Sequence, residues 1–231
     1  MRRTFQITEL INILMKQITK FWSWFQDNEE AIKNALLLGI NTKEVFHHFN
    51  RNYSYISKRI GFLIIIPSTD QGKFTIIFTA EGYRKLFTKL IALEDQAPQL
   101  QYFIAQAFIK PIQDKTPYLT GKDKPYVFKK YKIKISQLYI ALADYNITTK
   151  ELKINLYIPD YDRIKDCNEI ENNLKYIIME VIGEIAFRKH IKKIEFFDLP
   201  EATNGLLSII ELPDYIDYLY KINSRQKTRV I

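Results

Sequence analysis

Apolar residues near the start of the chain recur at steps of three and four, the spacing of one face of an α-helix. This stripe runs from Ile7 to Phe25 and predicts one amphipathic helix over that range. Trp22 and Phe25 continue the stripe, so we expect both to be buried. Trp24 lies ~200° around the helix axis from Trp22 and points elsewhere. Packing in a core, rather than a stacking platform for a ligand, explains most of this aromatic run.

Two further helices are predicted before residue 55. The acidic stretch 27–30 is typical of a helix start, because Asp27 can cap exposed N–H groups while Glu30 follows three residues later. Gly39 suits the position just past the end of that helix. A third, short helix is expected from Thr42. The acidic stretch is therefore interpreted as helix capping rather than catalysis.

Strands follow the helices in the first half of the chain. Residues 60–66 and 74–78 predict two strands, joined by a loop with the composition of a hairpin. Thr79 is expected to cap a helix that ends before Pro98. Residues 101–109 fit either a strand or a helix, and a strand is favoured.

The second half again places strands before a helix. Alternating patterns predict strands near 127–143 and 151–158, an amphipathic helix at 170–185, a strand at 191–197 and a last helix at 213–222. The expected fold class is α+β, with N-terminal helices followed by strand-hairpin and helix units on a mostly antiparallel sheet.

A proline-containing and lysine-rich stretch lies between the two halves. Residues 111–126 predict a long loop or a linker. The expected organisation is an N-terminal lobe at 1–110 and a C-terminal lobe at 127–231, or one continuous domain.

Composition places the chain among ordinary globular proteins, with 47% hydrophobic and 26% charged residues. The longest apolar run, Phe62–Ile66, is far shorter than the ~20 residues that span a bilayer. Neither a membrane span nor a signal peptide is predicted, and a cytoplasmic location is expected. Cys167 is the single cysteine, which excludes an internal disulfide and fits a reducing compartment.

Several short motifs occur in a characteristic order: Trp22 and Phe25 as Trp-x-x-Phe, FTAEG at Phe78–Gly82, Ala97-Pro98 at a helix end, and Gly183-Glu184 late in a long helix. This order resembles a family of bacterial proteins of unknown function, over roughly residues 20–200. The resemblance implies a bacterial, cytosolic α+β domain. Because that family carries no established activity, the resemblance implies no catalytic residue.

Metal-binding and nucleophilic patterns are weak. His47 and His48 are adjacent, so on a helix they diverge and cannot share a metal as an i, i+4 pair would. The third histidine, His190, and Cys167 complete no zinc-type cluster. We expect no metal and no cofactor.

Carboxylates offer a second possible chemistry. Glu180 and Glu184 lie one turn apart on the expected long helix, where an exposed polar face is the simplest interpretation. Asp160, Asp162 and Asp166 lack the glycine and spacing of a calcium loop. No phosphate-binding loop, dinucleotide fingerprint or serine elbow is present. The question of enzymatic activity stays open, with the pattern favouring none.

Positive charge gathers between residues 110 and 134, where eight lysines stand against two aspartates. Lys130, Lys132 and Lys134 alternate with apolar positions, which predicts a strand whose lysines face water. The candidate binding residues are Lys122, Lys124, Lys129, Lys130, Lys132, Lys134, Tyr118 and Tyr126.

These lysines allow more than one interpretation. Lysines on an exposed strand guard against edge-to-edge aggregation without any ligand. Alternatively, they bind an acidic protein, or phosphates with bases stacked on the tyrosines. We predict a non-enzymatic protein-binding or accessory module of the immunity or adaptor type. A nucleic-acid-binding module is the alternative, and a carboxylate-dependent hydrolase is the second alternative. The oligomeric state is not indicated.

Overall fold

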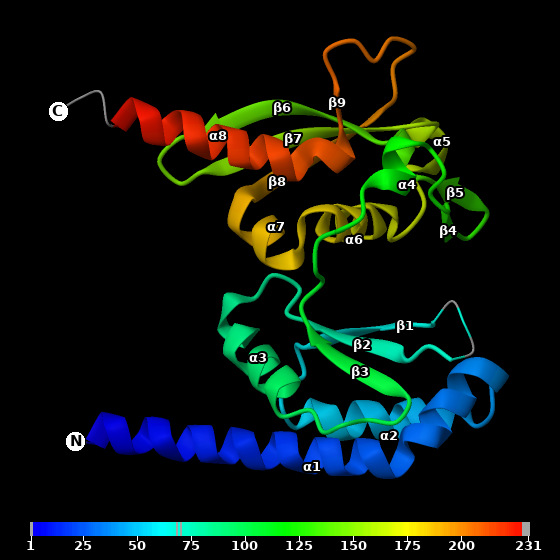
Figure 1. Cartoon of the computed structure of the whole chain (residues 1–231), viewed down its shortest axis with the longest axis vertical. Coiled ribbons are helices and arrows are strands. Elements are labelled where there is room, and N and C mark those ends of the chain that lie inside the picture. The colour runs from blue at the N-terminus through cyan, green and yellow to red at the C-terminus, as the bar shows by residue number, and fades with distance from the viewer. Residues whose placement is uncertain (1, 68, 70, 228–231) are drawn as a thin grey trace. The chain divides into compact units, whose positions relative to one another are not determined.

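Two hydrophobic cores divide the chain into an N-terminal unit, Met1–Ile109, and a C-terminal unit, Lys110–Ile231. The computed structural model describes residues 2–67, 69 and 71–227, and Figure 1 labels its elements. Helices precede strand and helix units, and most strand pairs are antiparallel, so the α+β prediction is confirmed. No helix in the described part of the chain is long and apolar enough to cross a membrane.

The N-terminal unit packs two helices against a three-stranded sheet. Its elements are α1 (Arg2–Leu38), α2 (Thr42–Ser54), β1 (Gly61–Ile65), β2 (Phe74–Thr79), η1 (Arg84–Leu86), α3 (Phe87–Asp95) and β3 (Phe103–Ala107). The sheet has the order β1-β2-β3, with β1 antiparallel and β3 parallel to β2. Figure 1 shows α1 and α2 running together along one face of this sheet. The hairpin, the helix from Thr42 and the favoured strand at 101–109 are confirmed.

Aromatic rings fill the core between these layers. Phe21 meets Phe49 and Phe78 with ring centroids 5.8 and 5.9 Å apart. The predicted burial of Trp22 and Phe25 is confirmed, and the Trp22 indole N–H donates to the Leu93 carbonyl at 2.9 Å. Edge-to-face contacts of this kind add stability beyond the area they bury.

The predicted boundary at Asp27 is wrong, because α1 continues without a break to Leu38. No glycine or proline interrupts residues 26–38, so nothing ends the helix there. The acidic stretch instead supplies Glu29, whose buried carboxylate accepts hydrogen bonds from the backbone N–H groups of residues 101–103. The acid thus anchors the start of β3.

Two further expectations for this unit need correction. The described part of the apolar stripe reaches the core from Leu14, which is half-buried against it, and Ile18 is fully buried, whereas Ile11 is largely exposed. The side chains of residues 7 and 10 lie outside the described part of the chain. Thr79 ends β2 instead of capping a helix, and its hydroxyl accepts the Glu81 N–H.

In the C-terminal unit, one face of a four-stranded sheet packs against helices. Its elements are α4 (Thr116–Leu119), β4 (Tyr126–Phe128), β5 (Tyr131–Ile133), η2 (Ile135–Gln137), β6 (Tyr139–Asn146), β7 (Glu151–Ile158), α5 (Tyr161–Ile164), α6 (Ile170–Ile182), α7 (Glu184–His190), β8 (Ile191–Asp198), β9 (Leu207–Ser208), η3 (Ile209–Glu211) and α8 (Leu212–Lys227). The sheet has the order β8-β7-β6-β9, with β8 parallel to β7, and β4 with β5 forms a separate hairpin.

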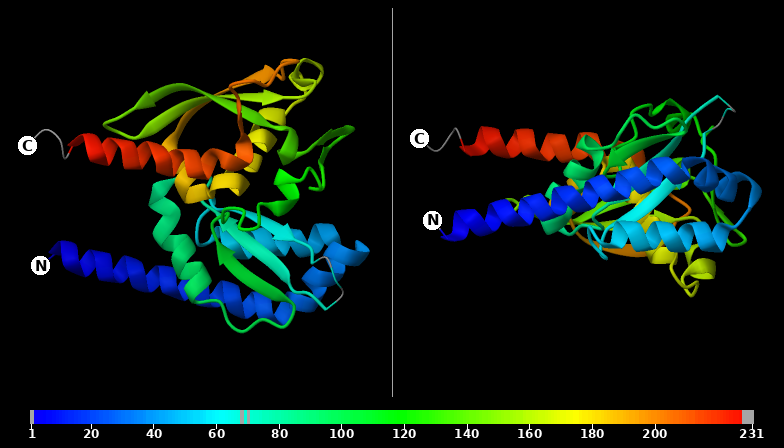
Figure 2. Two further views of the ribbon diagram at one scale, coloured as in Figure 1. Left: turned by 45° about the horizontal axis from the view of Figure 1, so that its top comes forward. Right: turned by 90° about the horizontal axis from the view of Figure 1, so that it is seen from below.

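An aliphatic core lies between this sheet and the helices. The alternating side chains of β7 from Leu152 to Ile158 face α6, which contributes Leu174, Ile178 and Val181. Figure 2 shows α6 and α8 on the same side of the sheet. The side chains at the intervening positions of β6, β7 and β8 lie on the opposite face of the sheet.

The predicted long helix at 170–185 is broken at Gly183, which has a positive φ of 82°. A side chain there would bring its Cβ within 2.9 Å of Pro111, and the neighbouring Ile112 N–H donates to the Glu180 carbonyl at 2.8 Å. Glycine is required because the chain at 111–112 crosses the break closely. As a result Ile185 points outward instead of into the core.

The predicted strand at 127–143 is also interrupted. Lys129 adopts a left-handed conformation, with φ 56°, and turns β4 back onto β5. The short η2 then separates β5 from β6. Lys130 therefore lies in a turn, Lys132 on β5 and Lys134 between β5 and η2. The expected alternation of three lysines along one strand is wrong.

Candidate binding site

The lysines singled out by the sequence all come from one stretch of the C-terminal unit, which we name the basic hairpin: the loop 120–125 together with β4, β5, their turn and Lys134. Lys122 and Lys124 come from the loop, and Lys129, Lys130, Lys132 and Lys134 come from the turn, β5 and the residues that follow it. All six are exposed except Lys134, which is half-buried.

None of these six lysines forms an ion pair with a carboxylate of the described chain. Lys134 donates to the Gly121 carbonyl at 3.0 Å, and the Lys130 ammonium lies 5.3 Å from the Tyr131 ring centroid. Their charges are therefore not neutralised locally.

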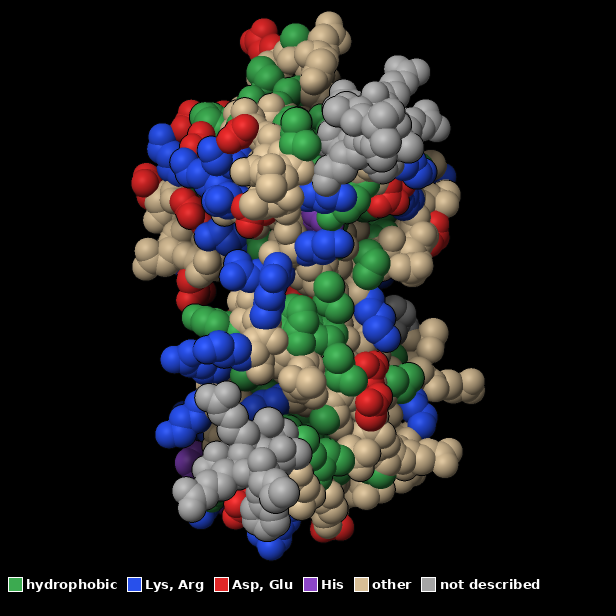
Figure 3. Space-filling view, turned by 90° about the vertical axis from the view of Figure 1, so that its left-hand side faces the viewer, with side chains coloured by type: hydrophobic (Ala, Val, Ile, Leu, Met, Phe, Trp, Pro, Cys, Tyr) green, Lys and Arg blue, Asp and Glu red, His purple; other side chains and the backbone are tan. Residues whose placement is uncertain are grey.

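Lysines elsewhere in the same unit behave differently. Lys153 pairs with Asp144 at 2.8 Å, and Lys115 pairs with Asp214 at the same distance. Figure 3 shows acidic and basic side chains interspersed over the upper part of another face. The basic hairpin thus differs from surfaces on which each lysine has an acidic neighbour.

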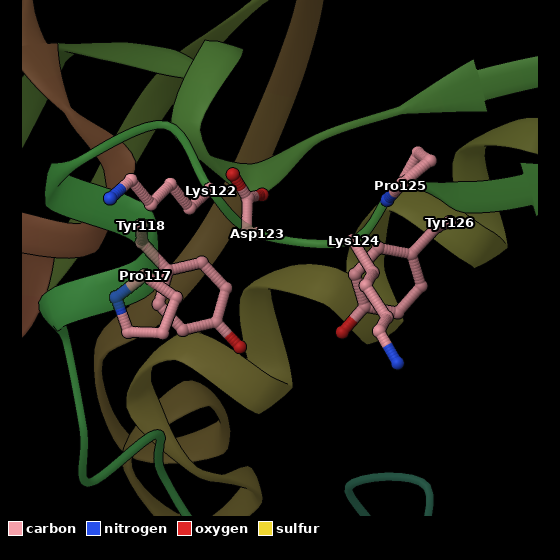
Figure 4. A pocket seen from close by; sticks show the side chains of 7 residues that line it. All are labelled: Pro117, Tyr118, Lys122, Asp123, Lys124, Pro125 and Tyr126. Atoms are coloured by element: carbon pink, nitrogen blue, oxygen red, sulfur yellow. The ribbon is translucent and has the colours of Figure 1, made fainter.

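A cavity of about 480 Å³ opens beside the basic hairpin. Its lining residues are Pro117, Tyr118, Lys122, Asp123, Lys124, Pro125 and Tyr126. In Figure 4 the hydroxyls of Tyr118 and Tyr126 point the same way, toward α6, while the Asp123 carboxylate turns to the opposite side. Both tyrosines that the sequence associated with the lysines are therefore brought to this site, with their hydroxyl ends directed inward.

Tyr126 is fixed by Glu180 of α6. Its hydroxyl donates to the Glu180 carboxylate. Burial raises the pKa of Glu180, although the hydrogen bond from Tyr126 acts in the opposite direction. Burial, followed by the hydrogen bond to Glu180, raises the pKa of Tyr126 strongly. Both groups are neutral over a wider pH range than exposed residues of their types.

The predicted solvent exposure of the two glutamates on this helix is wrong. Glu180 is largely covered and Glu184 is completely buried at the start of α7. The break at Gly183 removes the expected one-turn spacing on a single face, so the two carboxylates belong to different helices. The spacing of the two glutamates did not indicate that they lie on different helices. In the sequence, only the nearby Gly183 indicates the break.

Asp123 explains why the loop exposes its lysines. This residue is buried, and one carboxylate oxygen accepts the Ser136 N–H at 3.2 Å. The other oxygen has no hydrogen-bond partner among the described residues. Anchoring Asp123 against η2 directs the residues on either side of it, Lys122 and Lys124, to the surface.

Two exposed apolar side chains accompany the lysines, and sequence analysis did not single them out. Val127 on β4 is 61% exposed and Leu119 at the end of α4 is 64% exposed. In the register of the hairpin, Val127 lies opposite Lys132, on the outward face. Tyr126 and Phe128 instead face the core side, with their rings stacked 6.3 Å apart. The surface therefore combines exposed apolar side chains with lysines that pair with no described carboxylate.

A scan against protein-family models and searches of curated proteins and of solved structures each found no match to this chain. The family resemblance of the short motifs stays a prediction. Among residues 2–67, 69 and 71–227, no group of three His, Cys, Asp or Glu side chains is placed to hold a metal ion.

Proposed function

We propose that this protein is a non-enzymatic docking module that binds an acidic surface of another protein through the basic hairpin. The observation that supports the proposal is that six lysines have no ion-pair partner among the described residues, on the same stretch of chain as the exposed Val127 and Leu119. Protein interfaces commonly combine an apolar centre with a charged rim. Unpaired charge also accelerates encounter with a partner of opposite sign.

The underlying structure favours a preformed surface. Glu180 holds Tyr126 at the beginning of β4, and Asp123 holds the loop against η2. A surface that is ordered before binding loses less conformational entropy on association. The hairpin therefore presents its lysines and Val127 without first having to fold.

Nucleic acid is the second candidate, since unpaired lysines also bind phosphates. The tyrosines weigh against it. Tyr126 is hydrogen-bonded to a carboxylate and stacked on Phe128, so its ring is not open to a base. A hydrolase receives less support, because the Glu180 carboxylate already accepts a hydrogen bond from Tyr126.

The test is affinity capture from the native cell followed by direct binding to the purified partner. Reversing three exposed charges, Lys129→Glu, Lys130→Glu and Lys132→Glu, is expected to weaken binding by about a hundredfold, or ~2.7 kcal/mol. Val127→Ala is expected to weaken binding by about fivefold, since it removes an apolar contact at the centre.

A matched control reverses three exposed lysines of the N-terminal unit, Lys16, Lys58 and Lys85, and changes the net charge equally. This control is expected to bind as the unmodified protein does. Equal weakening in both triple variants would show that only the total charge matters, which contradicts a defined site.

Oligonucleotides provide the opposing measurement. If the basic hairpin engaged three phosphates, the logarithm of affinity would fall with the logarithm of salt at a slope of about −2 for a single strand. Sub-micromolar binding at about 150 mM salt, lost in the hairpin variant, would make nucleic acid the function.

A further inference from the structure

We propose that His190 is a pH switch for the C-terminal half of α8: the neutral ring holds residues 217–222 against the turn between β6 and β7, and its protonation releases them. This half of the helix runs beside that turn in Figure 1. None of the groups involved belongs to the basic hairpin, so the inference does not depend on the docking function.

Tyr220 of α8 contacts two neighbouring segments of the unit. Its ring meets the His190 ring, at the end of α7, edge to face, with centroids 5.1 Å apart and planes 87° apart. The Lys150 ammonium, from the turn between β6 and β7, lies 3.7 Å from the Tyr220 ring centroid. The Lys189 ammonium, also on α7, lies 5.2 Å from it. Tyr220 therefore joins the second half of α8 to both segments.

The His190 side chain is buried, with 5% of the residue exposed. Its Nδ1 lies 3.2 Å from the Lys150 carbonyl oxygen. Because a carbonyl only accepts, the neutral ring donates its Nδ1–H there, and an additional proton would go to Nε2. Lys150 thus contacts His190 through its backbone and Tyr220 through its side chain, so a change at His190 acts directly on the residues that hold α8.

The charges around His190 oppose its protonation. Among the described residues, the charged groups that act on it are Lys150 of the turn, Lys189 of α7 and Asp217 of α8. Protonation would place a third cation beside the Tyr220 ring, in a site with little water, against a single carboxylate. Burial and the two ammonium groups lower the pKa of His190, although the Lys150 carbonyl and Asp217 act in the opposite direction.

The direction of the switch follows from this difference. Release of α8 would expose the ring to water, where its pKa returns to the ordinary value of about 6.5. The docked state binds the proton less tightly, so docking is fully favoured above about pH 6.5 and weakens as the pH falls below it. Each unit by which the docked pKa lies below the released one shifts the equilibrium by up to about tenfold.

The first half of α8 has supports of its own. Leu212 and Ile216 are buried in the core of the unit, and Lys115 pairs with Asp214 at 2.8 Å. Aspartate and lysine keep their charges between about pH 5 and 7.5, so this part of the helix stays anchored. Acid therefore frees residues 217–222 while the helix start remains in place.

The experiment measures hydrogen exchange of the full chain by mass spectrometry at pH 7.5 and 5.0. Exchange is expressed as protection relative to the unstructured rate at the same pH, which removes the chemical effect of pH. Protection of residues 217–222 is expected to fall at least about threefold at the lower pH. Protection of α6 should stay within about twofold, since its core contacts do not involve His190.

Three variants locate the switch. His190→Gln keeps an amide donor for the Lys150 carbonyl but cannot titrate, so its protection at 217–222 should not change with pH. Tyr220→Leu removes the ring and should lower that protection at least about threefold already at pH 7.5. The control His48→Gln, an exposed histidine of α2, should keep the pH response of the unmodified protein.

Three results would overturn the inference: protection at 217–222 does not depend on pH; His190→Gln responds to pH as the unmodified protein does; or α6 loses protection equally, which would indicate unfolding of the whole unit. If His190→Gln does not fold, the exposed change Lys189→Gln decides, because removing one of the two cations should reduce the pH response. The charge-reversed hairpin variant should keep the full response, which separates failure here from failure of the docking function.

Discussion

In the N-terminal unit, phenylalanines from α1, α2, β2 and β3 meet at the centre of the core, whereas the described core of the C-terminal unit consists of Ile, Leu and Val apart from Tyr161. The aromatic residues of the C-terminal unit lie mainly around its margin. Tyr118 and Tyr126 border the cavity, and Tyr157 and Phe197 lie on the face of the sheet away from α6.

The difference shows that aromatic content alone does not indicate a binding surface. A phenylalanine in a closed core contributes mainly to stability, since it buries a large apolar area. An aromatic ring on a half-exposed strand contributes less to stability and remains accessible to a ligand. The run at residues 21–25 looked most like a ligand platform in the sequence, yet it lies in the core.

The largest expected effect is on the core of the N-terminal unit. Phe25→Ala should lower the free energy of unfolding by ~3–5 kcal/mol, because it empties a fully buried phenylalanine site. Phe197→Ala should cost no more than about 1 kcal/mol. Urea unfolding followed by circular dichroism measures both. Similar losses of unfolding free energy in the two variants would contradict the expected difference between the buried Phe25 and the exposed Phe197.

A smaller loss of stability is expected when the hydrogen-bonding group of Trp22 or of Tyr126 is removed. Trp22→Phe should cost ~1–3 kcal/mol, because the buried Leu93 carbonyl loses its donor. Tyr126→Phe should cost about 1 kcal/mol or less, since Glu180 can take up a proton when its donor is removed. The same unfolding measurement tests the order, and a costlier Tyr126 change would show that the Glu180 contact is a main support of the C-terminal unit.

The pH dependence of stability follows from Glu180. Burial raises its pKa in the folded protein above the unfolded value of about 4.3, so the folded state binds the proton more tightly between the two values. This contribution to stability is present at low pH and is lost as the pH rises through the folded pKa.

Replacing Glu180 by Gln abolishes that titration. The variant should therefore gain stability relative to the unmodified protein as the pH rises from about 4 to 7. Glu171→Gln, on the exposed side of the same helix, serves as the control and should show no such gain. A constant difference between Glu180→Gln and the unmodified protein across this range would contradict the raised pKa.

The smallest expected effect is on the basic hairpin. Lys129→Glu, Lys130→Glu and Lys132→Glu together should change the free energy of unfolding by less than about 0.5 kcal/mol, because these lysines pair with no described carboxylate. Lys153→Glu should lower the melting temperature more than the triple change does, since it places three acids together on one face of the sheet. Thermal unfolding compares the two.

The sequence predicted those elements whose pattern is local. The alternation from Leu152 to Ile158 and the helical stripe through Phe25 were sufficient to locate β7 and the buried side of α1. The fold class followed from the order of such elements.

Other features depend on partners distant in the chain. The acidic stretch 27–30 was interpreted as a helix start capped by Asp27, because nothing nearby indicated that residues 101–103 would bind Glu29. The break at Gly183 follows from the approach of Pro111, which no periodicity reveals. For the candidate site, the lysines were predicted, but only the folded structure shows that they have no acidic partner in the described part of the chain and that Val127 is exposed.

The contacts of Glu180 also bear on the order of events during synthesis. Its carbonyl receives the Ile112 N–H and its carboxylate receives the Tyr126 hydroxyl, so this one residue holds both ends of the loop that leads into the basic hairpin. The ribosome makes Glu180 only after 53 further residues have followed Tyr126. Because domains generally fold from the N-terminus as they emerge, the N-terminal unit can be complete while this loop still lacks its anchor. A partner that recognises the finished hairpin would therefore distinguish chains that extend beyond Glu180 from shorter nascent ones.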